Sequence, residues 1–402
     1  MANQNAFDVT IIGGYGHIGL PLGIMFARAG LQVALYDIDE SKRALIEAGQ
    51  MPFLEYDAEP ILKQVIGKTL HIAQGLHDIA ASDTVIITIG TPVDEYLNPK
   101  LLPILNLAEL LTEVLQPSQH IMLRSTIFPG TTQQLYDFFA RRGIKIHLSF
   151  CPERIVQGCA IHELGKFPQI VSGITDESVS RAQDLFSHLD VQTIKVSVLE
   201  AELAKLYSNA WRYIQFATAN QFYMIATEHG ANYDQIHYAM THGYDRAKNF
   251  PKPGFAAGPC LLKDTLQLSA FYRNGFQLGQ AAMWINEGLP SFIIENLRKK
   301  GFELMNTRVG LLGMAFKAET DDIRDSLSYK LAKILKFHGA AVVCSDEYVK
   351  DPTFVTKEEL IQTCQILIIA APHSAYTDLR IPEESHLVDI WNIARRHLPD
   401  DK

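Results

Sequence analysis

The feature that most limits the fold of this chain is a glycine-rich turn between an apolar run and a helical pattern. The run 8–12 is rich in β-branched residues and predicts a buried strand, and Gly14-Tyr-Gly-His-Ile-Gly19 follows it with the spacing G-x-G-x-x-G. A helical pattern covers 20–29, and Asp37 closes the next apolar run, 23 residues after Gly14. This strand–turn–helix context predicts a βαβ unit that binds a dinucleotide.

Each glycine of the turn has its own physical task. Gly14 permits the tight turn, Gly16 lets the backbone approach a pyrophosphate, and Gly19 allows close packing of helix and strand. The helix N-terminus then offers N–H groups and a positive dipole to the phosphates. Asp37 can accept both ribose hydroxyls, and the acids at 39 and 40 favour NAD over NADP, whose 2′-phosphate needs a cation. The alternative is a purely structural glycine turn. The predicted cofactor contacts here are Gly14, Tyr15, Gly16, His17, Ile18, Gly19 and Asp37.

The remaining pattern predicts an α/β protein of several domains. A length of 402 residues suggests two or three domains at about 150 residues each. Helical stretches separate near-continuous apolar runs, which is typical of a parallel, doubly wound sheet. The runs lie at 32–36, 84–89, 121–124, 144–148 and 170–171, and again at 308–312, 341–344, 366–369 and 387–390.

Between the two sets of strands the sequence has a helical pattern. Apolar residues recur every three or four positions from 199 to about 230, which predicts one long helix, and helical texture persists to about 300. We therefore predict two Rossmann-like, doubly wound domains joined by a central helical region with a long helix. The expected boundaries are 1–198, 199–300 and 301–402.

Composition and charge exclude several classes of function. The chain has 36 basic and 45 acidic residues, a net charge of −9 and no long Lys/Arg run, so nucleic acid and anionic membranes are poor partners. No apolar run reaches the roughly 18–20 residues of a spanning helix, and the N-terminus lacks a signal-peptide pattern. The five cysteines are scattered, with no C-x-x-C pair and no His/Cys metal spacing. We expect a soluble, cytoplasmic protein with no metal site.

A cysteine follows a loop of glycine, proline and small residues at 253–259. Cys260 stands three positions before Lys263 and four before Asp264, at an expected helix start. A helix N-terminus and a nearby Lys both favour the thiolate, which is the nucleophilic form. The alternative is a buried structural cysteine, and the residues alone leave the two interpretations equal.

Lys205 and Asn209 are separated by four positions within the predicted long helix, so both lie on one helix face. Lys205 has apolar neighbours, and a buried ammonium can do acid–base work. The alternative is a solvated lysine, which the spacing alone favours.

In these motifs the chain resembles the UDP-glucose/GDP-mannose dehydrogenase family, the nucleotide-sugar 6-dehydrogenases. The resemblance runs from Val9 to about Asn392. It rests on ordered motifs at 13–22, 90–92, 124–131, 151–155, 201–209, 258–264, 286–287 and 313–326. It implies an N-terminal NAD-binding domain, a central dimerisation domain and a C-terminal domain that binds the sugar nucleotide.

The resemblance also implies a reaction, in which the C6 alcohol of the sugar becomes a carboxylate and two NAD molecules each accept a hydride. Cys260 would trap the aldehyde as a thiohemiacetal, which the second oxidation turns into a thioester. Lys205, Asn209 and Asp264 would manage the alcohol proton and stabilise oxyanions. Glu153 would assist water attack on the thioester, and Thr126 would help to position that water.

Further binding residues are implied by the same resemblance. The expected cofactor contacts beyond the glycine turn are Thr91, Pro92, Ser125, Lys263 and Arg324. The expected substrate contacts are Arg154, Phe255, Gly258, Phe316 and Lys317. Arg246 is expected to reach the substrate of a neighbouring subunit in a homodimer formed through the central helix.

Some positions depart from the pattern of relatives. Arg124 stands where many relatives have Glu, and Leu262 replaces a common Pro. The position before Cys260 lacks the His of N-acetylhexosamine enzymes, which favours UDP-glucose as substrate and UDP-glucuronate as product. UDP-N-acetylhexosamine, TDP-glucose and GDP-mannose are the alternatives. Other readings are a single-step β-hydroxyacid-type dehydrogenase and a non-catalytic sensor of nucleotide sugars.

Overall fold

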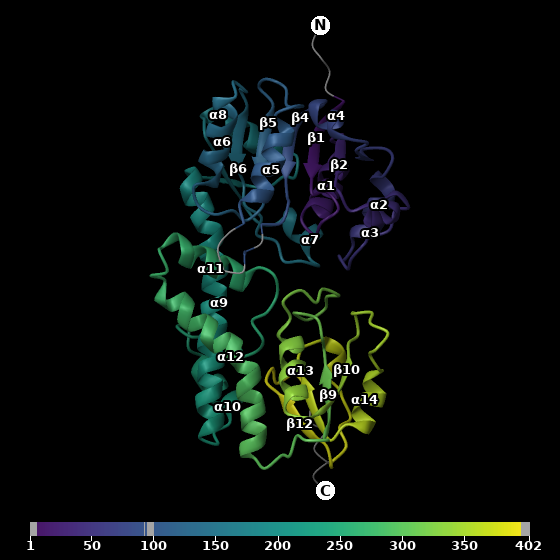
Figure 1. Ribbon diagram of the computed structural model, residues 1–402, viewed down its shortest axis with the longest axis vertical. Coiled ribbons are helices and arrows are strands. Elements are labelled where there is room, and N and C mark those ends of the chain that lie inside the picture. Colours follow the sequence, from purple (N-terminus) through teal and green to yellow (C-terminus); the bar gives the residue numbers. More distant parts are fainter. Residues whose placement is uncertain (1–5, 92, 95–99, 395–402) are drawn as a thin grey trace. The chain divides into compact units, whose positions relative to one another are not determined.

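The computed structural model describes residues 6–91, 93–94 and 100–394. The chain forms two compact units, residues 1–208 and 209–402. Figure 1 shows the elements of both units along the chain. Within the described ranges, no helix combines the length and the apolar character needed to cross a bilayer.

The first unit is built on an eight-stranded sheet with the order β3-β2-β1-β4-β5-β6-β7-β8. The order reverses between β1 and β4, which creates the crevice at the carboxyl ends of strands where α/β proteins bind ligands. The strands are β1 (Phe7–Ile12), β2 (Val33–Tyr36), β3 (Leu70–Ile72), β4 (Ser82–Ile87), β5 (His120–Leu123), β6 (His147–Phe150), β7 (Gln169–Gly173) and β8 (Thr193–Lys195).

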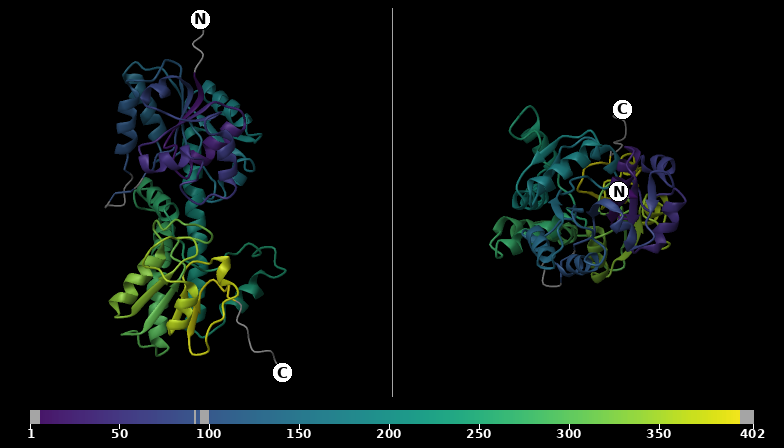
Figure 2. Two further views of the ribbon diagram at one scale, coloured as in Figure 1. Left: turned by 90° about the vertical axis from the view of Figure 1, so that its right-hand side faces the viewer. Right: turned by 90° about the horizontal axis from the view of Figure 1, so that it is seen from above.

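Helices flank this sheet on both sides (Figure 2), so its central strands are buried and their sequences are almost continuously apolar. Phe26 and Phe186 belong to one hydrophobic core, and Ile104 and Phe139 to a second. The helices are α1 (Gly19–Arg28), α2 (Glu40–Glu47), α3 (Ala58–Val65), α4 (Leu76–Ala80), α5 (Leu102–Leu111), α6 (Thr131–Arg141), α7 (Ala160–Leu164) and α8 (Asp176–Ser187).

The predicted doubly wound α/β fold is confirmed, with one difference in strand direction. β7 runs antiparallel to β6, with Ser149 opposite Gly173 and Phe150 opposite Ser172. The other strand pairs of the sheet are parallel. The expectation that the run at 170–171 joins a uniformly parallel sheet was therefore wrong, because an apolar run carries no information about its direction.

The long helix is also confirmed. α9 spans Val198–Glu228, 31 residues, and its positions Leu206, Ala210, Tyr213 and Ala217 are buried, as the three- or four-residue spacing predicts. α10 (Tyr233–Thr241), α11 (Leu261–Phe271) and α12 (Gln277–Lys299) follow.

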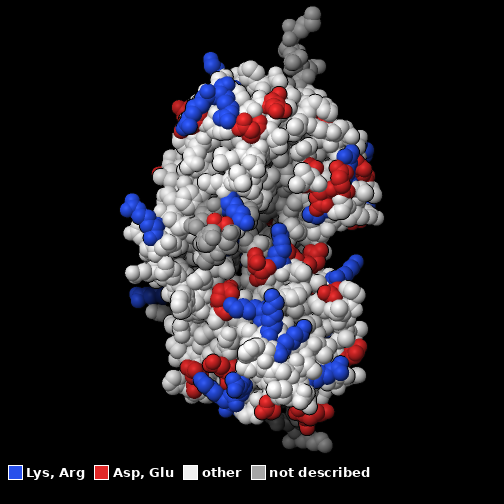
Figure 3. Space-filling view, viewed as in Figure 1, with Lys and Arg blue, Asp and Glu red and all other residues white. Residues whose placement is uncertain are grey.

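The second unit contains a four-stranded parallel sheet with the order β10-β9-β11-β12. Its strand order also reverses, between β9 and β11. The elements are β9 (Arg308–Leu312), α13 (Leu327–Phe337), β10 (Ala341–Ser345), α14 (Lys357–Thr363), β11 (Ile366–Ile369), the 3-10 turn η1 (Ser374–Tyr376) and β12 (His386–Asp389). On the face shown in Figure 3, basic and acidic side chains are interspersed rather than gathered by sign.

Candidate functional site

The glycine turn lies between β1 and α1. At two of its positions the surrounding backbone leaves no space for a side chain. A Cβ on Gly14 would lie 2.9 Å from Ile11 O, and one on Gly19 would lie 2.4 Å from Gly13 O. A Cβ on Gly16 would meet only Gly13 O, at 3.3 Å, so the protein packs nothing else against that position. In the first turn of α1, Leu20 N donates to Gly16 O at 3.0 Å and Pro21 has no N–H, so among the described residues Gly19 N is the group left for an anion. These features fit a bound pyrophosphate.

Asp37 is anchored beside this turn at the end of β2. Its Oδ2 accepts a hydrogen bond from Tyr15 N at 3.0 Å, and its Oδ1 accepts from Ile38 N at 2.8 Å. The carboxylate is only half-buried, so lone pairs remain for the hydroxyls of a ribose. Burial raises the pKa of Tyr15 to about 12, and the His17 ring packs 3.9 Å from the Phe53 ring centroid. The predicted turn residues and Asp37 thus lie together at the ends of β1 and β2.

Further predicted residues follow β4, β5 and β6 at the same edge of the sheet. Thr91 Oγ1 donates to Thr126 O, and buried Ser125 donates through Oγ to Ile89 O at 2.6 Å. Because parallel strands end at a common edge, these residues lie on the same side of the sheet as the glycine turn. Pro92, also predicted here, lies outside the described residues.

A buried ion pair joins the ends of β5 and β6. Arg124 Nη2 donates to Glu153 Oε2, and the two side chains are 0% and 5% exposed. Arg124 Nη2 also donates to Gln169 Oε1 at 3.2 Å, and its guanidinium lies 5.0 Å from the Phe186 ring centroid. Its Nε and Nη1 have no hydrogen-bond partner among the described residues. The guanidinium charge of Arg124 is therefore paired with the carboxylate of Glu153.

Glu153 is held as a carboxylate. Burial raises its pKa, but the charge and hydrogen bond of Arg124 lower it, as do the N–H groups of Arg154 and Ile155 at 2.7 and 3.0 Å, and the net pKa lies below the ordinary value. The exposed guanidinium of Arg154 donates instead to Pro168 O. The sequence carried a signal for this pair, since an arginine at the end of an apolar strand needs a buried acid.

In the second unit, Cys260 stands at the start of α11. Its carbonyl accepts the first helical hydrogen bond, from Asp264 N at 2.9 Å, and its side chain is exposed. Asp264 is fully buried, and its Oδ2 accepts from Asn209 Nδ2 at 2.5 Å. Its Oδ1 lies 3.4 Å from Lys263 Nζ. The structure thus unites Cys260, Lys263, Asp264 and Asn209.

Lys205 precedes Asn209 by one turn of α9 and is half-buried, between the buried and the solvated alternatives. Among the cysteines, all five of which lie in described ranges, Cys260 is the exposed one. Burial raises the pKa of both Cys151 and Cys344 to about 11. Those two thiols are poor nucleophiles near neutral pH.

The loop that leads to Cys260 is held by hydrogen bonds at two of its glycines. Gly254 and Asn220 exchange two hydrogen bonds, at 2.8 and 3.0 Å, and a Cβ on Gly254 would lie 2.0 Å from the Trp391 ring. Gly258 N donates to Asp325 O at 3.2 Å, with φ at +96°. Sequence reasoning missed Asn220 and Trp391. The motif at 286–287 was a partial signal, because Asn220 also donates to Asn286 Oδ1 at 2.9 Å.

Phe316 and Lys317 lie after β9, and a Cβ on Gly258 would meet the Phe316 ring at 2.5 Å. Lys317 Nζ lies 6.0 Å from the centroid of that ring. Arg324 forms a bidentate pair with Asp322, with Nη2 2.6 Å from Oδ2, so its guanidinium is already engaged. Phe255 is buried in the hydrophobic core, and Arg246 is exposed after α10, apart from these groups along the chain.

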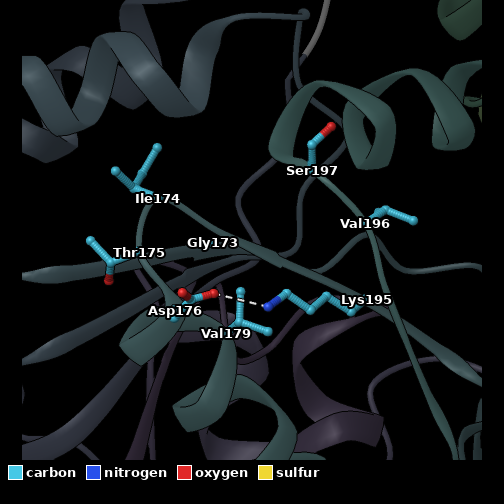
Figure 4. A pocket seen from close by; sticks show the side chains of 8 residues that line it. All are labelled: Gly173, Ile174, Thr175, Asp176, Val179, Lys195, Val196 and Ser197. Atoms are coloured by element: carbon cyan, nitrogen blue, oxygen red, sulfur yellow. Dashed lines mark hydrogen bonds and ion pairs between the residues drawn. The ribbon is translucent and has the colours of Figure 1, made fainter.

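A depression of about 640 Å³ lies elsewhere on the first unit, between the ends of β7 and β8 and the start of α8 (Figure 4). Asp176 and Lys195 form an ion pair of 2.9 Å across it. Because β7 is antiparallel to β6, the carboxyl end of β7 lies at the edge of the sheet opposite to the glycine turn. None of the predicted site residues lines this depression.

Comparison with protein families gives three matches along the chain. Residues 7–190 match the NAD binding domain of the UDP-glucose/GDP-mannose dehydrogenase family, 199–288 match its central domain, and 310–396 match its UDP binding domain. The first match confirms the prediction of NAD as cofactor.

Individual relatives agree with these matches. A UDP-N-acetyl-D-mannosamine dehydrogenase of Pyrococcus horikoshii is 30% identical over 377 residues, which cover 90% of this chain and 89% of that protein. The solved structure of the UDP-D-ManNAc dehydrogenase from that organism superposes with a TM-score of 0.88 at 26% identity, covering 96% of each chain. A UDP-glucose dehydrogenase from Pyrobaculum islandicum has the same fold, with a TM-score of 0.88 at 23% identity over 98% of this chain and 96% of that one.

Proposed function

Because the chain belongs to the UDP-glucose/GDP-mannose dehydrogenase family, we propose that it oxidises the C6 alcohol of a UDP-linked hexose to the carboxylate in two steps. The observation that carries the proposal is Cys260, an exposed thiol at the start of α11, one turn before a buried carboxylate that Asn209 binds. A single hydride transfer needs no nucleophile. A four-electron oxidation does, because the aldehyde must be held and converted to an oxidisable adduct.

The glycine turn and Asp37 would hold NAD, which would supply the hydride acceptor for each of the two oxidations. In the first, Asp264 and Lys205 take up the alcohol proton through an ordered water that Asn209 helps to place. Cys260 Sγ then adds to C6 of the aldehyde and the oxygen takes a proton, giving a thiohemiacetal. Oxidation of this adduct yields a thioester. Water attack breaks the C6–S bond, releases the carboxylate and returns the thiol.

Glu153 enters at the hydrolysis step. Its pairing with Arg124 keeps it anionic, so we assign it the task of accepting a hydrogen bond from the attacking water and orienting it, with Thr126. A carboxylate with a lowered pKa is a weak base, and orientation is the task that suits it best.

We propose UDP-N-acetylmannosamine as the first candidate substrate and UDP-glucose as the second. The first is the substrate named for the relatives from Pyrococcus horikoshii and Methanocaldococcus jannaschii, both 30% identical to this chain. The second is favoured by Pro259, which stands before Cys260 where the N-acetylhexosamine enzymes that the sequence resembles have His. We propose that the reaction takes place in the cytoplasm, where thiols stay reduced.

The test is the stoichiometry of NADH on a panel of UDP-N-acetylmannosamine, UDP-N-acetylglucosamine, UDP-glucose, TDP-glucose and GDP-mannose. We expect two NADH per sugar nucleotide consumed, with a carboxylate as the product. One NADH per sugar would contradict the proposal and favour a single-step dehydrogenase. Thermal stabilisation by NAD and sugar nucleotides without any NADH formation would indicate a non-catalytic sensor.

We also propose that the enzyme is a homodimer formed through α9. Four large apolar side chains on this helix, Tyr207, Trp211, Phe222 and Ile225, are 41–60% exposed. Their spacing of four, eleven and three residues places them along one face at 100° per residue. An apolar face of this kind is typical of an interface. Arg246 would then act on the substrate of the partner.

Replacing Trp211 with Glu is expected to convert the dimer into a monomer, because a charge would be buried in the centre of the proposed interface. Sedimentation equilibrium measures the mass directly. The matched control is Phe337→Glu on α13, which changes an equally large side chain that is 85% exposed and should leave the dimer intact. A Trp211→Glu protein that is folded and still dimeric would place the interface elsewhere.

A further inference from the structure

The two sheets carry an aspartate at equivalent positions. Asp37 follows Tyr36, which pairs with Ile12 at the end of β1, and Asp346 follows Ser345, which pairs with Leu312 at the end of β9. A positive-φ glycine, Gly13 or Gly313, comes directly after the first strand in each case. In a dinucleotide-binding sheet this carboxylate receives the ribose hydroxyls. The two aspartates differ in whether their carboxylate oxygens can still accept hydrogen bonds from a ribose.

The carboxylate of Asp346 accepts its hydrogen bonds from the protein's own backbone. Its side chain is 0% exposed. Asp346 Oδ2 accepts from Met314 N at 2.6 Å and Ala315 N at 2.9 Å, and its Oδ1 accepts from Tyr348 N at 2.8 Å and Val349 N at 2.9 Å. Two carboxylate oxygens have about four acceptor sites, and these four N–H groups share them with His373 Nε2, 3.2 Å from Oδ2, so none is left for a ribose.

His373 is also fully buried and completes the arrangement. Its Nε2 lies 3.2 Å from Asp346 Oδ2, so Nε2 carries the proton and donates it. Its Nδ1 then accepts from Glu319 N at 3.0 Å. The Glu319 carboxylate in turn accepts from Ser374 N at 2.7 Å and from the Tyr348 hydroxyl. Each nitrogen of the imidazole thus has one fixed role.

The consequence is a loop that is held at both ends. Asp346 binds the backbone at its start, Met314 and Ala315, and His373 binds the backbone at its end, Glu319. Phe316 and Lys317, the residues expected to contact the sugar nucleotide, lie between these two anchors. A loop ordered by folding does not have to be ordered again when a ligand binds.

We propose that Asp346 and His373 are positioning residues that hold loop 314–319 in the conformation that receives the UDP moiety, and that this domain binds its nucleotide without a carboxylate on the ribose. This rests on the proposed function in one respect, the contact of Phe316 and Lys317 with the sugar nucleotide. The aspartate that serves as a ligand contact in the NAD-binding sheet thus serves as an internal anchor in the second sheet.

Two isosteric replacements separate the two nitrogens of His373. In His373→Asn the amide oxygen stands in for Nδ1 and can still accept from Glu319 N, whereas in His373→Gln the amide nitrogen stands in for Nε2 and only the bond to Asp346 is kept. We expect His373→Gln to weaken UDP binding about 10-fold, because the loop loses the hydrogen bond that holds Glu319 N. We expect the affinity of His373→Asn to stay within about 3-fold of the wild type. Isothermal titration with UDP measures this.

Kinetics and NAD binding supply the controls. The KM for the UDP-sugar should rise in His373→Gln with kcat and the KM for NAD unchanged, because the glycine turn and Asp37 belong to the other unit. A folded His373→Gln protein with wild-type affinity for UDP would overturn the proposal. Equal losses in both variants, with matching losses in melting temperature, would also overturn it and assign His373 a structural role alone.

A second variant keeps the test decisive if His373→Gln does not fold. Tyr348→Phe removes only the hydroxyl that Glu319 accepts, at a half-buried position, and should raise the Kd for UDP about 3-fold. An unchanged Kd in this variant would overturn the proposal. If the wild-type protein itself does not bind UDP, the proposed substrate class fails, and that outcome is distinct from any difference between variants.

Discussion

Replacing Cys260 with serine is expected to lower steady-state NADH formation about 1,000-fold or more, because a serine hydroxyl is a far weaker nucleophile than a thiolate. The aldehyde would no longer be held as an adduct that can be oxidised a second time. The measurement is NADH absorbance at saturating NAD and UDP-sugar. Binding of both ligands should stay unchanged, because Cys260 is exposed and serine differs from cysteine by one atom.

The matched control is Cys159→Ser, which alters a half-buried thiol at the start of α7 in the other unit and should leave the rate unchanged. Near-full activity of Cys260→Ser would contradict the two-step mechanism. It would favour instead a β-hydroxyacid-type dehydrogenase, which transfers one hydride and needs no cysteine.

Replacing Arg124 with methionine is expected to destabilise the first unit by about 3–5 kcal/mol, because it leaves the Glu153 carboxylate buried without its partner. Differential scanning calorimetry is the suitable measurement, since Trp211, Trp284 and Trp391, all three tryptophans, lie in the second unit and their fluorescence does not report on the first. The double variant Arg124→Met/Glu153→Gln removes both charges and should recover much of the loss.

The pH dependence of that loss has a definite sign. In the wild type the pKa of folded Glu153 is below its unfolded value, so the pair stabilises the fold above the unfolded pKa and the contribution is lost as pH falls through the folded pKa. Without Arg124, burial raises the pKa of Glu153, and a neutral carboxyl is the form the site then prefers. The destabilisation by Arg124→Met should therefore shrink as pH falls toward about 4. A loss that is the same at all pH values would contradict the assigned role of the pair.

Local patterns in the sequence were sufficient to predict the elements and part of the site. The turn at Gly14–Gly19 combines a strand, a helix start and an acid in one short segment, and all of it is confirmed as a βαβ unit. The run 308–312 is β9 to the residue. Lys205 and Asn209 share a helix face, because four residues make about one helical turn.

Other features depended on residues far apart in the sequence, and only the tertiary structure decided them. Arg124 and Glu153 are separated by 29 positions, and Asp346 and His373 by 27. Each pair joins the ends of two different strands, so no local spacing connects its members. The antiparallel direction of β7 and the stacking of Trp391 on Gly254 are of the same kind.

The sequence by itself therefore determined which residues could do chemistry, since that depends on residue type and on short-range helix and turn geometry. The tertiary structure decided what each of them is free to do. Donors from the loops that follow the strands take up the acceptor sites of Asp346, whereas Asp37 keeps acceptor capacity for a ligand, although both stand at the same place in their sheets.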